Sequence, residues 1–523
     1  MNTAEQLNLK ASLVELITGL VDLPEPLPVE LLATVTGVKM DSRLLQEGDL
    51  FIACFGRNHD AREFIRGAID IGASAVLAES GGDWQGIRVI NEVAVIAIDN
   101  LSARISEIAS RFYSHPSARL HVIGITGTNG KTSCSQFIAQ TLTDLEYQCG
   151  VIGTLGYGVA GGLKETQLTT PDAVFTQMAL AEMVENGIDP VVMEVSSVGL
   201  HQKRVKAVNF NTAIFTNLSR DHLDYHESME AYAENKKKLF TAEGLKHGIV
   251  NLDDPYALSI INSIAKDVEV STYSINNSIA TVYAKDLKLT RQGFEASIVT
   301  PIGSGEVSGK LIGCFNFSNL LAVVTVLISY LSRENPISIE LLCEKISGLK
   351  PVNGRMEIVG DSDDITVIVD YAHTPDGLRS ALTALRDHFD GNICCVFGCG
   401  GNRDKGKRPM MGEIAESFAN KLVIADDNPR NEEGDEIVHH ILSGINKPED
   451  VQVIRDRADA ISYAIDTAST GDVVLIAGKG HETHQDIGGN KLIFSDCNQV
   501  RLALQKRTEN RSKNNYKGFK GFD

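Results

Sequence analysis

The sequence predicts an α/β protein of three domains, and three observations support this prediction. The chain has 523 residues, which is too long for a single hydrophobic core. From about residue 121 onward, apolar strand-like runs alternate with helical patterns, as in right-handed βαβ units with mostly parallel strands. The pattern breaks near SHPSAR (114–119) and again at SGLKPVNG (347–354). We therefore expect a small N-terminal α/β domain, a central parallel-sheet domain of the phosphate-loop type and a Rossmann-like C-terminal α/β domain.

We place the domains at residues 1–116, 117–350 and 351–505, followed by a disordered basic tail at 506–523 that lacks periodicity. The net charge of −19 argues against a nucleic acid or an anionic membrane as the main partner. The nine cysteines are unevenly spaced, and the first residues predict neither a signal peptide nor a membrane span. We expect a cytoplasmic monomer that binds small molecules and does not insert into membranes.

Each domain has its own strand-like runs. DLFIACF (49–55) and IRVINEVAVIAI (87–98) belong to the N-terminal domain. The central domain has VIGIT, VVMEVSS, TAIFTNLS and HGIVNLDD, and the C-terminal domain has ITVIVD, ICCVF, KLVIAD and DVVLIAG. In the C-terminal domain each run ends in a polar loop with glycine or proline. Since ligands bind beyond the carboxyl ends of parallel strands, these four loops predict one shared site.

A glycine-containing loop joins a strand to a helix in HVIGITGTNGKTSCSQF. Gly127 and Gly130 allow the backbone to approach phosphates, and the helix N-terminus offers free N–H donors. Lys131 is suited to neutralise the β- and γ-phosphates and Thr132 to hold Mg²⁺. The strict phosphate-loop pattern has glycine where this chain has Ile125, so the loop is a shorter-spaced variant. We prefer this interpretation to a glycine turn beside a surface lysine.

Two further residues follow central strands. Glu194 ends the apolar run VVMEV, and His222 lies in the loop after TAIFTNLS. A carboxylate or a loop histidine alone is more often structural than a metal ligand. Beside a phosphate loop, the two residues form a magnesium-site hypothesis.

Eight motifs stand in one order along the chain: GITGTNGKTS, MEVSS, FTNLSRDHLDYH, GRME, DYAHTPD, FGCGGNRDKGKRP, DDNPR and AGKGHE. Over about residues 35–495 this set closely resembles the Mur ligases, the ATP-dependent amide-forming enzymes of bacterial cell-wall precursor synthesis. The resemblance implies that ATP phosphorylates the terminal carboxylate of UDP-MurNAc-L-Ala-D-Glu and that an amine attacks the acyl phosphate. Because a carboxylate is a poor electrophile, phosphorylation supplies a leaving group, and cations must neutralise the transition-state charge.

The resemblance also implies a nucleotide site and a catalytic centre. The positions that match ATP contacts are Gly127, Thr128, Asn129, Gly130, Lys131, Thr132, Ser133, Asn316, Asn319 and Arg355. The positions that match the catalytic centre are Lys131, Glu194, His222 and Lys236, and those that match Mg²⁺ ligands are Thr132, Glu194, His222 and Lys236 as a CO₂-derived carbamate. Carbamylation of Lys236 requires a neutral amine, hence a pKa lowered by burial. Asp370 and His373 match positions at a domain junction.

For the UDP-sugar peptide, the resemblance implies that the N-terminal domain binds the uridine end. The matching positions are Met40, Ser42, Arg57, Asn58, His59, Thr169, Thr170, Ser196, Gln202 and Arg204. Val198 departs from the histidine that members often have there, which puts one polar contact in doubt. Ala61 follows Asp60 where members usually have glycine, which suggests an altered loop.

The DNPR loop (427–430) resembles the signature of members that add meso-diaminopimelate rather than L-lysine. Diaminopimelate carries a far carboxylate that suits a guanidinium, whereas Arg430 would repel the terminal ammonium of lysine. Glu482 is expected to accept from the distal ammonium. The matching contacts are Arg403, Asp427, Asn428, Pro429, Arg430, Gly478 and Glu482.

Four alternatives stay open: the same chemistry with L-lysine, a related ligase such as folylpolyglutamate synthase or a neighbouring Mur ligase, a nucleotide-dependent regulatory ATPase, and an inactive homologue. DNPR, GKGHE and the N-terminal DSR argue against a different ligase. A regulatory ATPase would release phosphate without an acceptor and an amine. The presence of Lys131, Glu194, His222 and Lys236 argues against an inactive homologue.

Overall fold

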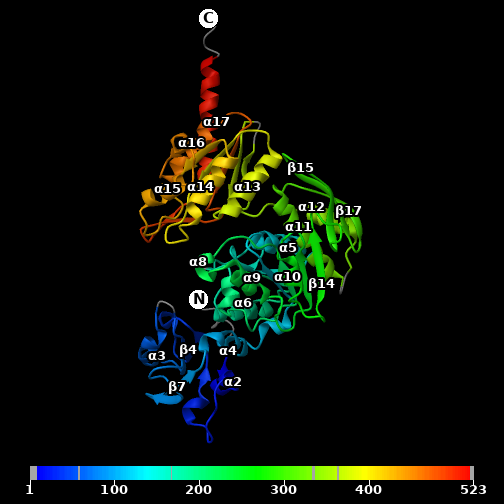
Figure 1. Ribbon diagram of the computed structural model, residues 1–523. Coiled ribbons are helices and arrows are strands. Elements are labelled where there is room, and N and C mark those ends of the chain that lie inside the picture. The colour runs from blue at the N-terminus through cyan, green and yellow to red at the C-terminus, as the bar shows by residue number, and fades with distance from the viewer. Residues whose placement is uncertain (1–8, 57–58, 167, 333–335, 362–363, 519–523) are drawn as a thin grey trace.

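The computed structural model describes residues 9–56, 59–166, 168–332, 336–361 and 364–518. Sheets of five, ten and six strands follow one another along the chain. The three sheets and their helices lie in series along an arc, from the N-terminal domain at one end to the C-terminal domain at the other (Figure 1). The predicted three-domain α/β fold is confirmed.

The N-terminal domain folds around a sheet of order β3-β4-β5-β7-β6, in which β6 runs antiparallel to β7 and the other pairs are parallel. Leu50, Leu77 and Ile96 are buried on its strands. The elements are β1 (Ala11–Ser12), α2 (Leu13–Ile17), β2 (Thr34–Val35), β3 (Gly37–Lys39), β4 (Asp49–Ala53), α3 (Ile65–Ile71), β5 (Ala75–Glu79), β6 (Ile87–Ile90), β7 (Val93–Ile98) and α4 (Ile105–Phe112).

The middle domain has a sheet of order β10-β9-β11-β8-β12-β13-β14-β15-β16-β17. Its strands are β8 (Val122–Thr126), β9 (Gly150–Gly153), β10 (Gly156–Val159), β11 (Val191–Glu194), β12 (Thr212–Phe215), β13 (His247–Asn251), β14 (Glu269–Ser274), β15 (Val282–Thr290), β16 (Gly293–Thr300) and β17 (Gly303–Gly309). Its helices are α5 (Lys131–Asp144), α6 (Ala173–Glu185), α7 (Ser197–His201), α8 (Leu223–His226), α9 (Met229–Lys237), α10 (Ala257–Ile261), α11 (Cys314–Leu331) and α12 (Ile339–Ser347).

The strand bearing the phosphate loop, β8, lies between β11 and β12, and both neighbours run parallel to it. The loops after these three strands therefore meet at one edge of the sheet. At the far side, β15, β16 and β17 form an antiparallel meander that the βαβ pattern did not predict. Among the described residues, α11 alone is long and apolar enough to cross a membrane, but 67% of it is buried in the protein. Its apolar side chains fill the core of the middle domain.

The C-terminal domain has a sheet of order β18-β19-β23-β20-β21-β22, in which β18 is antiparallel to β19 and the other pairs are parallel. The strands are β18 (Glu357–Asp361), β19 (Thr366–Asp370), β20 (Ile393–Phe397), β21 (Lys421–Ile424), β22 (Gln452–Val453), β23 (Val473–Ala477), β24 (His484–Ile487) and β25 (Asn490–Ile493). The helices are α13 (Pro375–His388), α14 (Lys407–Phe418), α15 (Gly434–Leu442), α16 (Arg457–Thr467) and α17 (Asp496–Gly518).

The expectation that the chain becomes disordered from residue 506 is wrong for residues 506–518, because α17 continues to Gly518. Arg507 explains the difference. Its side chain is buried, donates to the Asp364 carboxylate at 2.8 Å and also donates to the carbonyl of Ala468 at 2.7 Å. Sequence periodicity does not reveal an anchor of this kind, since the partners lie far away in the chain.

Breaking the Arg457–Asp496 ion pair should destabilise the C-terminal domain. Both side chains are fully buried, and the guanidinium donates two hydrogen bonds of 2.8 Å to the carboxylate. Asp496→Ala leaves a buried charge without a partner, which costs about 3–5 kcal/mol of the free energy of unfolding. Denaturant unfolding measures the loss. The control Glu234→Ala, which breaks the more exposed pair with Lys237, should cost less than about 1 kcal/mol; equal losses would contradict the prediction.

Candidate functional site

The phosphate loop lies between the end of β8 and the start of α5. Lys131 Nζ donates to the carbonyl oxygens of Gly127 at 2.7 Å and of Thr128 at 2.9 Å. Glycine is required at two positions. A β-carbon on Gly127 would lie 1.8 Å from Thr216 Oγ1, and one on Gly130, where φ is +85°, would lie 2.4 Å from Asn319 Oδ1. The neighbouring side chains therefore leave room for backbone alone, as a phosphate-binding loop needs.

The hydroxyl of Thr132 connects the middle and C-terminal domains. It donates to Glu194 Oε2 at 2.9 Å and accepts from Arg355 Nη2 at 3.2 Å. Glu194 is fully buried at the end of β11 and also accepts from the backbone N–H and the hydroxyl of Thr154. Arg355 lies over the ring of Tyr371, 4.4 Å from its centroid. Thr132, Glu194 and Arg355, predicted separately, are thus brought into one cluster.

Lys236 and His222 lie near the ring of Tyr232. Lys236 Nζ is 4.5 Å from the ring centroid, and the His222 ring lies edge-on at 6.3 Å. Tyr232 Oη is 3.2 Å from the hydroxyl of Thr128 in the phosphate loop. Tyr232 therefore links both predicted residues to the nucleotide loop.

Burial and neighbouring charges shift the pKa values of three side chains in this region. Burial, and next the charge of Lys131, holds the pKa of Lys236 well below its ordinary value. Burial also lowers the pKa of Lys131. Burial raises the pKa of Asp221, but the neighbouring His222, then His373 and Lys407, lower it by more, so the net pKa is lowered.

The predicted magnesium ligands are only partly assembled. Thr132 and Glu194 are in direct contact, whereas the side chain of His222 is 50% exposed and lies 3.4 Å from Asp221. Within the described ranges, three or more His, Cys, Asp or Glu side chains do not come together as a metal-binding group. Thr132 and Glu194 therefore place two oxygen atoms together that could bind a metal ion, and the other predicted ligands do not join them in the described part of the chain.

The remaining nucleotide residues surround the same loop. Asn129 is exposed, and its side-chain amide lies 3.4 Å from Asp376 of the C-terminal domain. Ser133 is buried in α5, and Asn316 and Asn319 are buried in the first turns of α11. Asp370 and His373, which match positions at a domain junction, also lie nearby, since Asp370 accepts from the backbone N–H of Met356, next to Arg355, and His373 contacts Tyr371.

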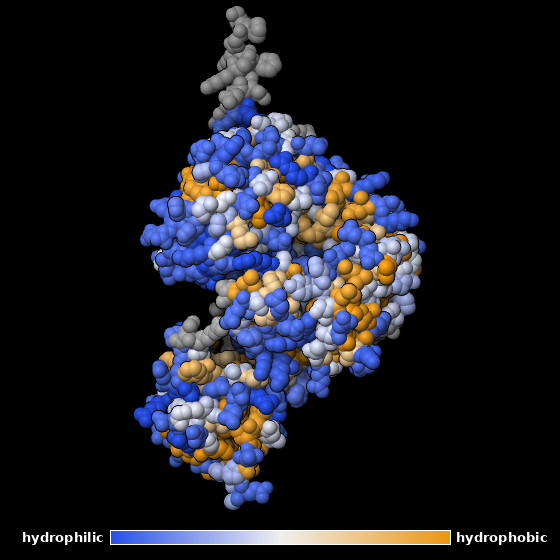
Figure 2. Space-filling model, in the orientation of Figure 1, coloured by the Kyte–Doolittle hydropathy of each residue, from blue (hydrophilic) through white to orange (hydrophobic). Residues whose placement is uncertain are grey.

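The four C-terminal loops meet at one edge of the sheet, as the strand pattern predicted; the loop after β19 joins the loop after β23 where the rings of Tyr371 and His481 lie 5.2 Å apart. Arg430 Nη1 donates to the carbonyl of Gly401 at 2.8 Å, which joins the loops after β21 and β20. Asn428 Nδ2 donates to Glu482 Oε2 at 2.9 Å, which joins the loops after β21 and β23. Arg403 is exposed beside them, and Asp427, Pro429 and Gly478 are buried. The surface is hollowed between the C-terminal and middle domains (Figure 2).

The residues predicted to hold the peptide end form a hydrogen-bonded chain. Arg204 donates to the carbonyl of Thr170 at 2.7 Å and to Gln202 Oε1 at 2.6 Å. Thr170 Oγ1 donates to the carbonyl of Glu194 and accepts from the backbone N–H of Ser196. Thr169 lies 3.1 Å from the hydroxyl of Thr154. These hydrogen bonds connect Arg204 with Glu194, which ends β11 beside the phosphate loop.

On the N-terminal domain, Met40 and His59 are exposed and Ser42 is half-buried, while Arg57 and Asn58 lie outside the described residues. Neither departure disturbs the local backbone. Val198 is half-buried within α7, whose N-terminus Ser196 caps. Ala61 begins a short 3₁₀ helix that Asp60 caps by accepting from the backbone N–H of Arg62.

The sequence reasoning missed several residues that hold the site together. Tyr232 gave no motif signal. Lys479 is fully buried and stands beside the predicted Gly478, three residues before Glu482, so its spacing could have been noticed. Arg408 is fully buried and donates to Glu432, which follows the DNPR loop.

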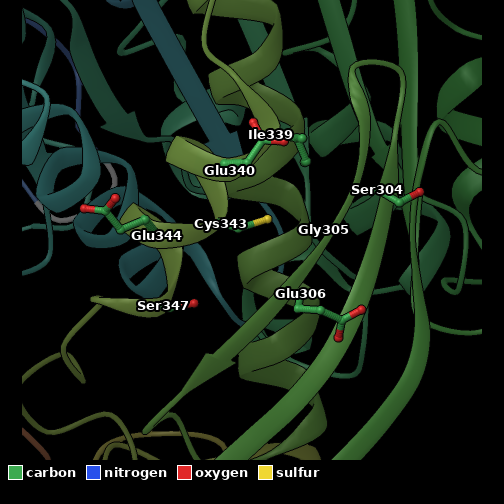
Figure 3. Close-up of a pocket in the computed structure, with 8 residues that line it drawn as sticks. All are labelled: Ser304, Gly305, Glu306, Ile339, Glu340, Cys343, Glu344 and Ser347. Atoms are coloured by element: carbon green, nitrogen blue, oxygen red, sulfur yellow. The ribbon is translucent and has the colours of Figure 1, made fainter.

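A separate open pocket of about 330 Å³ lies between β17 and α12 (Figure 3). Its lining is Ser304, Gly305, Glu306, Ile339, Glu340, Cys343, Glu344 and Ser347. None of the predicted site residues contributes to it. We therefore assign the chemistry to the strand edges and not to this pocket.

Comparisons with known proteins identify the family. Family models match residues 34–113 (Mur ligase family, catalytic domain), 125–327 (Mur ligase middle domain) and 354–480 (Mur ligase, glutamate ligase domain). A Coxiella burnetii protein named UDP-N-acetylmuramoyl-L-alanyl-D-glutamate–2,6-diaminopimelate ligase is 47% identical over 474 residues, which cover 90% of this chain and 96% of the relative. The chain belongs to the Mur ligase family.

Other Mur ligases support the assignment. A Pseudomonas aeruginosa protein of the same name is 45% identical over 465 residues, covering 89% of this chain and 94% of the relative. A solved structure of a UDP-N-acetylmuramoyl-L-alanyl-D-glutamate–2,6-diaminopimelate ligase is 33% identical, with a TM-score of 0.67, and the match covers 96% of this chain and 100% of that one. MurF from Acinetobacter baumannii, at 17% identity and a TM-score of 0.64, shares the fold.

Alanine at Gly130 should distort the phosphate loop of this Mur ligase. The substitution combines a positive φ with a clash against Asn319, so we expect a loss of about 1–3 kcal/mol in the free energy of unfolding and weaker nucleotide binding. The matched control is Gly161→Ala, where φ is +89° but the β-carbon meets open space. Denaturant unfolding and nucleotide titration measure both variants. Identical behaviour would show that the clash has no effect.

Proposed function

We propose that this Mur ligase joins meso-2,6-diaminopimelate to UDP-MurNAc-L-Ala-D-Glu and converts ATP to ADP and phosphate, in cytoplasmic synthesis of peptidoglycan precursors. One observation carries the proposal: four relatives that are 42–47% identical over about nine-tenths of this chain all bear the name of that ligase. We expect the enzyme to act as a monomer on soluble small molecules.

The proposed reaction has two steps. The terminal carboxylate of the UDP-sugar peptide attacks the γ-phosphate of ATP, so that ADP leaves and an acyl phosphate forms. The amine of diaminopimelate then attacks the acyl carbon, and phosphate leaves as the amide bond forms. Lys131 and the backbone N–H groups of residues 127–130 are suited to neutralise and orient the phosphates. The N-terminal domain and the chain of contacts from Thr170 to Arg204 are proposed to hold the UDP-sugar peptide.

Thr132 and Glu194 fit a hard cation, because Mg²⁺ prefers oxygen ligands and these two oxygens lie 2.9 Å apart. We propose that they hold Mg²⁺, joined by His222 and by a carbamate on Lys236. When bound, Mg²⁺ neutralises phosphate charge during phosphoryl transfer. Arg355 donates to the same Thr132 hydroxyl and is proposed to contact the nucleotide phosphates.

The amino-acid site is proposed at the edge formed by the loops after β20, β21 and β23. Arg403 and Arg430 supply guanidinium groups for the far carboxylate of diaminopimelate, and Glu482 supplies an acceptor for its ammonium. L-Lysine lacks that carboxylate, which is why we favour diaminopimelate. A regulatory ATPase that forms no bond is the alternative of another class.

Phosphate release from ATP tests the proposal. With UDP-MurNAc-L-Ala-D-Glu present, we expect release with meso-diaminopimelate and only background release with L-lysine or with no amine. Release with L-lysine would keep the ligase and overturn the specificity. Release without any amine would favour the regulatory ATPase.

Arg430→Ala should raise the KM for diaminopimelate about 10- to 100-fold, because a hydrogen-bonded charge pair contributes about 1.5–3 kcal/mol. The KM for ATP should stay within about twofold if Arg430 contacts only the amino acid. Arg501→Ala, at an exposed arginine of α17, serves as the control. An equal rise in both KM values would contradict the role of Arg430.

Carbamylation of Lys236 should depend on pH in a defined direction. Since its pKa is lowered, the amine is neutral above that pKa and can react with CO₂, whereas below it the amine is protonated and the carbamate is lost. With isotopically labelled bicarbonate, carbon NMR should show a carbamate signal at mildly alkaline pH that fades on acidification. Lys237→Arg should keep the signal and Lys236→Arg should abolish it; a signal that survives in Lys236→Arg would assign the carbamate elsewhere.

A further inference from the structure

A buried lysine lies at the centre of the proposed amino-acid site. The side chain of Lys479 is fully buried in the loop after β23. Its ammonium donates to Asn428 Oδ1 at 3.0 Å and to Glu482 Oε2 at 2.8 Å, and it lies 3.8 Å from Asp427 Oδ1. Lys479 therefore lies beside Asp427, Asn428 and Glu482, three of the side chains predicted from the sequence to bind the amine substrate. Lys479 itself was not among the predicted residues.

Lys479 determines which way the Asn428 amide faces. Asn428 Oδ1 accepts from Lys479 and from the backbone N–H of Asp486 at 2.9 Å. With its oxygen held by two donors, the amide must present its nitrogen to Glu482, and Nδ2 donates to Glu482 Oε2 at 2.9 Å. A flipped amide would place NH₂ against an ammonium and a backbone N–H.

The same contacts leave one carboxylate oxygen of Glu482 for a ligand. Lys479 and Asn428 both donate to Oε2, while Oε1 accepts no hydrogen bond from the residues that the structure describes. The side chain is 31% exposed, so Oε1 can reach a ligand. Burial raises the pKa of Glu482, but the charge and hydrogen bond of Lys479 outweigh it and hold the pKa below its usual range. Glu482 is therefore ionised and can bind a substrate ammonium.

Asp427 contributes a second open acceptor. Its Oδ1 is buried and has no hydrogen-bond partner among the described residues, since 3.8 Å to Lys479 is too long for a hydrogen bond. A β-carbon at Gly478 would lie 3.2 Å from Asp427 Oδ2, so glycine leaves this carboxylate uncovered. Asp427 and Glu482 therefore both lie beside the Lys479 ammonium, and each keeps one carboxylate oxygen without a hydrogen bond from the described residues.

We propose that Lys479 is a positioning residue for the amine substrate, which fixes the Asn428 amide and binds Glu482 Oε2 so that Glu482 Oε1 receives the substrate ammonium. This inference rests on the proposed function. Lys479 is too deeply buried to touch the substrate or the acyl phosphate, so it acts through its two partners. All hydrogen bonds of its ammonium within the described structure go to those two side chains.

The test is a double-mutant cycle on the full-length enzyme with steady-state kinetics. Lys479→Met removes the charge at similar length and should raise the KM for diaminopimelate about 10- to 100-fold, because charged hydrogen bonds are lost, while the KM for ATP stays within about twofold. Glu482→Gln alone should also raise the KM for diaminopimelate. In the Glu482→Gln background, Lys479→Met should add less than about threefold, because Lys479 acts on the substrate through Glu482, both directly and by way of the Asn428 amide that donates to Glu482.

Two controls keep the test decisive. Lys421→Met removes an exposed lysine of β21 and should leave both KM values unchanged. Lys479→Arg keeps a charged donor and should restore part of the loss. Equal increases in the KM for ATP and for diaminopimelate, or fully additive effects with Glu482→Gln, would overturn the inference. Failure of the unmodified enzyme to use diaminopimelate would instead overturn the proposed function, so the two failures are distinguishable.

Discussion

The nucleotide site depends on basic side chains that gather around the phosphate loop, where burial and mutual repulsion disfavour their charged forms. Burial lowers the pKa of Lys131, which the charges of Glu194 and Asp221 oppose, and burial together with the charge of Lys131 lowers the pKa of Lys236. Removing a cation from water without a full set of counter-charges is costly, so the region favours any anion that fits. Phosphate groups carry the negative charge that this region favours, and so would the proposed carbamate on Lys236. Gly127 and Gly130, which have no side chains, let such an anion approach the backbone of the loop.

Sheet topology explains how distant residues share this environment. In both larger sheets, adjacent parallel strands end at the same edge and deliver one polar loop each. The two edges meet where Arg355 reaches Thr132 and where Asn129 reaches Asp376. The proposed phosphate chemistry and the proposed amine site therefore belong to different domains but to one interface. A change in the relative position of the domains would alter both sites together.

The sequence predicted the parts of the molecule that follow a periodic rule. The strands, the parallel order around β8 and the shared edge of the C-terminal loops all come from apolar runs that end in polar loops. The antiparallel meander and the helical continuation at 506–518 were missed, because they depend on long-range partners such as Asp364 for Arg507. Tyr232 was missed for the same reason, since its contact with Thr128 arises only when separate segments come together. Lys479 was missed although Glu482 lies only three residues away, and only its contact with Asn428 joins separate loops.

The anchoring of α17 bears on how the protein forms on the ribosome. Asp364 and its partner Arg507 are 143 residues apart. Arg507 is therefore synthesised, and leaves the ribosome, long after the strand next to Asp364. Since domains usually fold in order during synthesis, the middle domain can be complete while the C-terminal sheet still awaits its last helix. During that interval the middle-domain side of the interface can be folded while the C-terminal side is still incomplete. Nascent chains are then expected to acquire nucleotide-loop structure before they acquire the amine site.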